Sequence, residues 1–128
     1  MIKAYLVGIS TQFEGEEIEV RYRIFDGEEL ISKKSKMLKY RKPALVGNVA
    51  MSTLLKELES YKDRDIVVII NDGALYETIR GTSGTKNLEL LEKAKETRNE
   101  LSNFVNLEIR NISGNHEEIS EWNEVLKP

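Results

Sequence analysis

Residues 65–81 read DIVVIINDGALYETIRG, and this stretch decides the fold. It opens with five apolar, mostly β-branched residues, Ile66 to Ile70. A short continuous apolar run of this kind predicts a strand that is buried on both faces. The run stops at Asn71-Asp72-Gly73, and beyond the glycine apolar residues recur at helical spacing. We therefore predict a buried strand, a polar tip at its carboxyl end, and a short helix that starts there.

Asp72 is the acidic side chain that this arrangement places at the strand tip. In open α/β sheets, binding and catalytic sites form at the carboxyl ends of strands. A short polar side chain before a helix is also the usual N-cap, because it accepts a hydrogen bond from a free backbone N–H group. Asp72 is thus a candidate site residue, and capping the helix is the simpler interpretation of it.

The hydrophobic pattern also predicts the elements on either side of this stretch. The expected strands cover residues 2–9, 17–25, 29–38 and 105–112, and the expected helices cover 43–61, 88–104 and the segment after Asn115. In the strand over 17–25, the alternation predicts one apolar face and one solvated face that carries Arg21 and Arg23. Asp26-Gly27 predicts a tight hairpin after it, since glycine adopts positive φ readily.

Length and composition indicate one globular domain over residues 1–128. Apolar residues make up 40% of the chain and charged residues 32%, which is typical of a folded protein with a real core. No apolar run approaches the about 18 residues that span a membrane, so we expect no membrane contact. The chain has no cysteine, which excludes disulfides and thiolate chemistry and fits a cytoplasmic protein.

The charge is distributed unevenly along the chain. Residues 33–42, KKSKMLKYRK, hold six basic side chains and no acidic one. Because the whole chain has a net charge of −3, the remaining residues carry −9. The basic segment is a candidate contact for an anionic partner such as a nucleic acid. Lysines also protect an edge strand from pairing with another chain, so both interpretations stay open. The candidate nucleic-acid-binding residues are Lys33, Lys34, Lys36, Lys39, Arg41 and Lys42.

The order of elements is three strands, a helix, a strand, two helices, a strand and a helix. Short turns join the first three strands into an antiparallel meander, and helical crossovers add the last two in parallel. This five-stranded mixed α/β sheet with helices on its faces resembles the ribonuclease H-like fold over the whole chain. The best local matches are IINDGALYETIRG and NLEIRNISGNHEEISEWNEVL. They are similar to the family's fourth strand with its helix, and to its last strand, loop and final helix.

The resemblance implies a cluster of four carboxylates that holds two Mg²⁺ or Mn²⁺ ions for nuclease chemistry. Matched residue by residue, the first-strand aspartate is replaced by Val7, and the first-helix glutamate falls near Ala50. Asp72 keeps the fourth-strand aspartate and is the candidate metal ligand. The last-helix aspartate falls near Asn123, which with Asp72 completes the candidate catalytic pair.

Two functions follow from this pattern of matches. The first is a ribonuclease H-like domain that has lost two-metal nuclease activity and serves as a module binding RNA, DNA, an RNA–DNA hybrid or a protein. The alternative is a divergent Mg²⁺- or Mn²⁺-dependent nuclease whose carboxylates have moved. The acids that are placed to substitute are Glu14, Glu16, Glu121 and Glu124.

Overall fold

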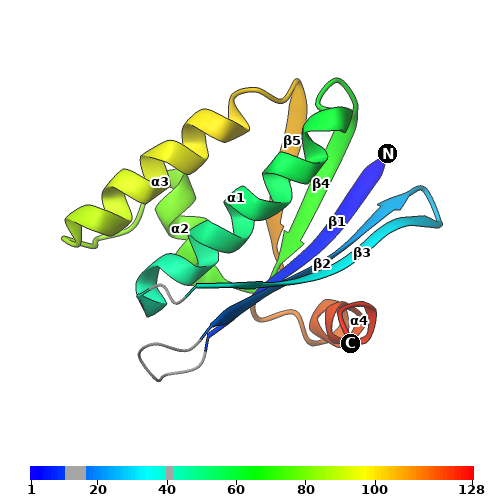
Figure 1. The fold of residues 1–128 in the computed structure, drawn as a ribbon, viewed down its shortest axis with the longest axis horizontal. Helices are drawn as coiled ribbons and strands as arrows, with labels where there is room; N and C mark the ends of the chain where they lie inside the picture. Colours follow the sequence, from blue (N-terminus) through cyan, green and yellow to red (C-terminus); the bar gives the residue numbers. More distant parts are fainter. Residues whose placement is uncertain (11–16, 40–41) are drawn as a thin grey trace.

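The computed structural model describes residues 1–10, 17–39 and 42–128. The described residues form a five-stranded mixed sheet in the order β3-β2-β1-β4-β5 (Figure 1). Antiparallel pairs join β1 (Ile2–Ile9) to β2 (Ile18–Asp26) and β2 to β3 (Glu29–Leu38). Parallel pairs join β1 to β4 (Asp65–Ile70) and β4 to β5 (Asn106–Asn111). This is the mixed sheet that the sequence predicts.

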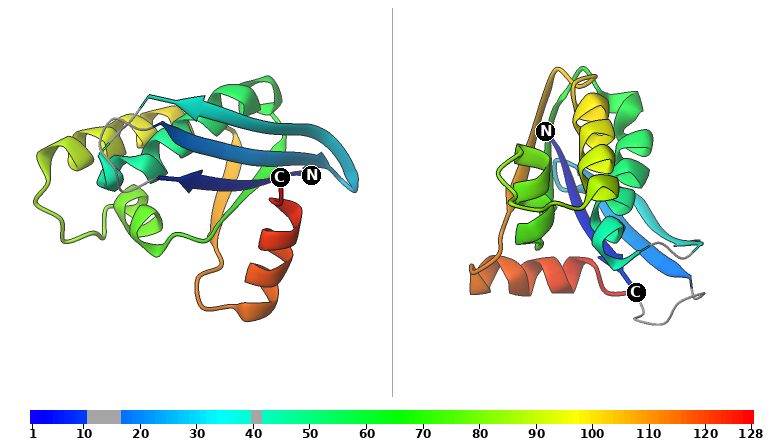
Figure 2. Two further views of the ribbon diagram at one scale, coloured as in Figure 1. Left: turned by 60° about the horizontal axis from the view of Figure 1, so that its bottom comes forward. Right: turned by 90° about the vertical axis from the view of Figure 1, so that its left-hand side faces the viewer.

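Helices cover both faces of the sheet (Figures 1 and 2). The larger layer contains α1 (Val46–Leu58), α2 (Gly73–Arg80) and α3 (Leu88–Leu101), while α4 (His116–Val125) packs on the opposite face. Single 3₁₀ turns flank α1 over Pro43–Leu45 and Glu59–Tyr61. No helix within the described ranges combines the length and hydrophobicity that crossing a bilayer demands.

The central strand β4 contributes to a core on each side of the sheet. Ile66, Val68 and Ile70 pack towards α1, and Val67 and Ile69 pack towards α4. The alternation follows from the two-residue period of a strand, and it explains why the stretch 66–70 is apolar at every position. The larger core lies between the sheet and α1–α3 and contains a continuous apolar stripe of α1.

Asn87 and Asn115 are short polar residues directly before helical patterns, a position that predicts N-caps, and both caps are confirmed. The Asn87 side chain accepts a hydrogen bond from Leu90 N at the start of α3, and Asn115 accepts one from Glu118 N at the start of α4. The Glu118 carboxylate pairs with Arg110 on β5. This ion pair ties the start of α4 to the neighbouring strand.

The solvated face predicted for β2 is wrong at its two arginines. Arg23 is only 3% exposed, because α4 ends above it. Its guanidinium donates to the carbonyl of Lys127 at 3.0 Å, and Arg21 donates to the carbonyl of Leu126 at 2.9 Å. Leu126 is the C-cap of α4 and Lys127 follows it, so the two cations lie at the negative end of the helix and stabilise α4 on the sheet.

Candidate functional site

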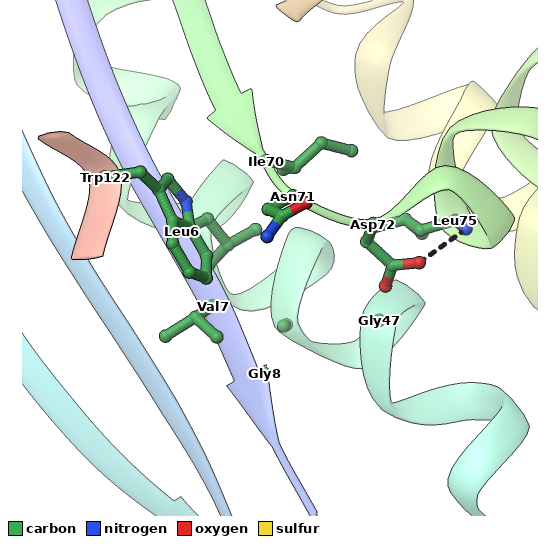
Figure 3. Close-up of a pocket in the computed structure, with 10 residues that line it drawn as sticks. Leu6, Val7, Gly8, Gly47, Ile70, Asn71, Asp72, Leu75 and Trp122 are labelled. Atoms are coloured by element: carbon green, nitrogen blue, oxygen red, sulfur yellow. Dashed lines mark hydrogen bonds between the residues drawn. The ribbon is translucent and has the colours of Figure 1, made fainter. Parts of the chain in front are cut away.

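A small cavity of about 50 Å³ lies where the carboxyl ends of β1 and β4 meet α1, α2 and α4 (Figure 3). This is the sheet end at which open α/β folds place their sites. The cavity has room for one or two water molecules and none for a nucleotide. Its lining is mostly apolar and consists of Leu6, Val7, Gly8, Gly47, Ala50, Ile70, Asn71, Asp72, Leu75 and Trp122.

Asp72 is the N-cap of α2, as the local sequence predicts. Its backbone is extended, with φ −154°, and its Oδ1 accepts a hydrogen bond from Leu75 N at 3.0 Å. The Asp72 N–H group donates in turn to Asn111 Oδ1 at 3.2 Å on the end of β5. The carboxylate is therefore held in place, with one oxygen bound to the helix that follows it.

On α1, the residue opposite Asp72 is Gly47. A Cβ at this position would lie 3.0 Å from Asp72 Oδ2 and 3.3 Å from Leu75 Cβ. Ala50, the expected helix position, lies one turn further on and packs against Gly8 of β1. Both α1 residues that line the cavity lack a metal-binding group, and Figure 3 shows the Asp72 carboxylate close to the helix at Gly47.

On α4, the residue at the cavity is Trp122 and not Asn123. Asn123 is exposed and does not line the cavity. Trp122 is 9% exposed, and its indole Nε1 is buried without a hydrogen-bond partner among the described residues. Val7 supplies the β1 side of the cavity. The structure therefore brings Asp72 together with Val7 and Trp122, and it leaves the candidate Asn123 outside.

The acidic residues expected to substitute for the missing carboxylates either have other partners or lie outside the described residues. Glu121 accepts a hydrogen bond from the Tyr5 hydroxyl at 3.1 Å, and Glu124 pairs with Lys127 at 2.6 Å. Glu14 and Glu16 fall outside the described residues. In the part of the chain that the structure describes, no three Asp, Glu, His or Cys side chains gather closely enough to hold a metal ion.

A polar network beside Asp72 was missed by the sequence reasoning. The Ser113 hydroxyl lies 3.1 Å from Asn71 Oδ1 and 2.9 Å from Asn111 Oδ1, and its single proton is shared between these two acceptors. Asn71 follows β4 and Asn111 ends β5, and these strands are parallel neighbours. Polar residues at the ends of two adjacent parallel strands are the signal that predicts this contact. The network fixes the segment before Asp72 and so orients its carboxylate.

The basic segment runs along β3 and the residues after it. Lys33, Lys34 and Lys36 are exposed on the strand, and Lys39 is exposed beyond its end. Lys34 forms an ion pair with Glu57 of α1, and Lys42 pairs with Glu89 of α3 at 2.7 Å. Arg41 lies outside the described residues.

Glu57, the acid of α1 nearest in sequence to the expected ligand position, is committed to β3. It accepts hydrogen bonds from Lys34 Nζ and, at 3.3 Å, from Ser32 Oγ. Burial favours its neutral form, but the bonds and the charge of Lys34 outweigh burial and hold the pKa of Glu57 below its ordinary 4.5. Glu57 therefore stabilises the packing of α1 on β3 and does not join Asp72 as a candidate metal ligand.

The described residues do not fit the metal pair that the resemblance implies. Mg²⁺ prefers several oxygen ligands in octahedral geometry, and two ions need converging carboxylates. The cavity offers the Asp72 carboxylate, one of whose oxygens caps α2, together with the Asn71 amide. The neighbouring positions on β1, α1 and α4 carry a valine, a glycine and a tryptophan.

Comparisons with solved structures confirm the fold. The ribonuclease H1 of the halophilic archaeon Halobacterium salinarum NRC-1 superposes with a TM-score of 0.77 at 17% identity, covering 98% of this chain and 96% of that one. The LC11 ribonuclease H1, solved in complex with an RNA/DNA hybrid, superposes with a TM-score of 0.75 at 18% identity and covers 98% and 96%. The N-terminal ribonuclease H domain of Rv2228c from Mycobacterium tuberculosis gives 0.71 at 9% identity, with 98% and 92% covered.

No protein-family model and no curated protein sequence matches the chain. At these identities the structural similarity defines the fold and leaves the activity to be argued from the site. The chain thus has a ribonuclease H-like fold, a five-stranded mixed sheet with helices on both faces.

Proposed function

We propose that this chain is a ribonuclease H-like domain that has lost two-metal nuclease activity and serves as a binding module. The observation that carries the proposal is the environment of Asp72. It is the one carboxylate among the residues that line the cavity, and it is used to cap α2. A side chain in this role contributes to the fold whether or not a metal is present.

The three positions around Asp72 support the loss of catalysis for separate physical reasons. Val7 has no donor atom for a cation. At Gly47, a Cβ would lie 3.0 Å from Asp72 Oδ2, so any side chain there requires the carboxylate to shift. The indole of Trp122 presents an N–H group, which is a hydrogen-bond donor and cannot coordinate a metal.

The experiment that tests the proposal measures cleavage of an RNA–DNA hybrid in Mg²⁺ and in Mn²⁺. Wild type and Asp72→Asn are purified side by side, so that the variant controls for contaminating nuclease. We expect no cleavage, or equal cleavage from both preparations. Cleavage by wild type that Asp72→Asn abolishes would establish the alternative, a divergent nuclease with relocated carboxylates.

Nucleic acid and protein are the two partner classes of this module. The solved complex of the LC11 enzyme with an RNA/DNA hybrid supports a nucleic acid. The net charge of −3 and the ion pairs that already occupy Lys34 and Lys42 support a protein, since nucleic-acid-binding domains present a broad basic surface. A nucleic-acid partner predicts affinity that falls steeply as salt is raised.

A further inference from the structure

We propose that the outer edge of β3 binds an extended acidic segment of a partner protein as an added β-strand. Within the described residues, β3 pairs with β2 alone and is the terminal strand of the sheet. The outer N–H and C=O groups of such a strand are available to another chain. This inference goes beyond the proposed loss of catalysis and does not depend on it, because the strand edge is separate from the Asp72 cavity.

The length of β3 makes it the stronger of the two sheet edges for strand addition. It contains ten residues, whereas β5 at the opposite edge contains six. Backbone hydrogen bonds accumulate along the paired length, so the longer edge gives the larger affinity. The two edges also differ in charge. The strand β5 carries one acidic and one basic side chain, Glu108 and Arg110, whereas β3 begins with Glu29 and then carries several lysines.

The lysines of β3 determine which chain can pair with it. Lys33 lies on the α4 side of the strand, because its Cα partner on β2 is Arg23, and Lys34 and Lys36 lie on the α1 side. A second copy would place lysines opposite lysines, which is destabilising. Acidic residues at successive positions would instead place side chains on both faces of the added strand, opposite Lys33 and Lys36, and this favours an acidic strand over self-association.

Two exposed apolar side chains mark the ends of the same edge. Leu30 is 46% exposed and Met37 is 58% exposed. Their Cα partners on β2 are Phe25 and Glu19, so both lie on the α4 side together with Lys33. The expected ligand therefore has acidic residues in its middle and apolar residues near the ends of the paired segment.

A phosphate backbone would use these residues differently. It would contact the lysine ammonium groups alone and leave the row of backbone groups unpaired. Of the described basic side chains in segment 33–42, Lys34 and Lys42 already hold carboxylates. The three that remain lie on β3 or one residue beyond it, whereas nucleic-acid-binding domains present a broad basic surface, so the edge favours a peptide.

The test uses the full chain and a synthetic peptide as long as β3, which has four successive Glu residues in its middle, Val towards its ends, and both ends blocked. Binding is measured by calorimetry, and its location by hydrogen exchange of the backbone amides. We expect binding that slows exchange of β3 amides and leaves the edge of β5 unchanged. A peptide N-methylated along one edge keeps every charge but cannot pair with a strand, and we expect it not to bind.

Two matched protein variants separate the effect of the β3 lysines on peptide binding from the effect of the net charge. The variant Lys33→Glu/Lys36→Glu is expected to bind about tenfold more weakly, because two cross-strand attractions become repulsions. The control Lys86→Glu/Lys95→Glu makes the same change in net charge at exposed positions away from β3 and is expected to bind like wild type. Circular dichroism confirms that both variants are folded.

Each of four results would overturn the proposal. These are no binding at about 1 mM peptide, equal binding of the N-methylated peptide, protection outside β3, and protection of β3 by a short RNA, DNA or hybrid but not by the peptide. The last result would assign the edge to nucleic acid. None of them bears on the cleavage experiment with Asp72→Asn, so the two proposals fail separately.

Discussion

Replacing Asp72 by alanine distinguishes a helix cap from a catalytic carboxylate by the sign of its effect on stability. As a cap, Asp72 accepts the Leu75 N–H bond at 3.0 Å in a partly buried position. Its removal leaves that N–H group without its partner and costs about 1 kcal/mol of the free energy of unfolding. For a domain of this size, that loss lowers Tm by about 4 °C.

A carboxylate in a catalytic cluster gives the opposite result. Several carboxylates held together repel one another without metal, so replacing one of them raises stability. The variant Asp72→Asn sharpens the comparison, because asparagine is an equally good N-cap. We expect Asp72→Asn to lie within about 0.5 kcal/mol of wild type and Asp72→Ala to be clearly less stable.

The assay is urea unfolding followed by circular dichroism, in metal-free buffer. Asn115→Ala is the matched control, since Asn115 caps α4 by the same contact with Glu118 N at 3.1 Å. We expect Asn115→Ala and Asp72→Ala to lose similar stability. An Asp72→Ala protein as stable as wild type, or more stable, would refute the capping role on which our reasoning depends.

Three further predictions concern Gly47, Trp122 and Glu57. Gly47→Ala improves helix propensity by about 1 kcal/mol but places a Cβ 3.0 Å from Asp72 Oδ2. We therefore expect urea unfolding to show no increase in the free energy of unfolding. An increase of about the full 1 kcal/mol would contradict the close approach. Trp122→Phe should lower the free energy of unfolding by less than about 1.5 kcal/mol, because the indole N–H has no partner to lose among the described residues. Trp122→Ala should lower it by about 3–5 kcal/mol. Equal losses from the two variants would show that the N–H group is needed for stability. Burial raises the pKa of Glu57, but its hydrogen bonds and the charge of Lys34 together outweigh burial and hold the folded-state pKa below its ordinary 4.5. Its contribution is therefore present above pH 4.5 and is lost as pH falls through the lower folded value. The stability difference between wild type and Glu57→Gln should shrink in that range in a pH series, and a difference that grows on acidification would reverse the sign.

Local sequence was sufficient for the features that depend on neighbours in the chain. The strand over 66–70 was predictable because every position is apolar, and both of its faces are buried. The caps at Asp72, Asn87 and Asn115 were predictable because each is a short polar residue directly before a helical pattern. These contacts span three residues, so no tertiary information is needed to infer them.

Features set by the rotation of a helix or by a distant segment were not predictable. Whether Ala50 or Gly47 of α1 lies opposite Asp72 depends on the position of the helix along its axis to within one turn. Whether Trp122 or Asn123 of α4 reaches the cavity depends on one residue of rotation. Adjacent helical residues point about 100° apart, so an uncertainty of one residue changes the chemistry of the site. Arg23 is buried because α4, about 100 residues later, ends over it.

Titration with Mn²⁺ tests the central claim that the Asp72 site does not hold the catalytic metals. Paramagnetic broadening of backbone amide resonances reports a bound ion directly and requires no substrate. We expect no saturable broadening centred on Asp72, Asn71 and Gly47, in wild type or in Asp72→Asn. Saturable broadening of those amides in wild type, lost in Asp72→Asn, would instead establish a metal site at this sheet end.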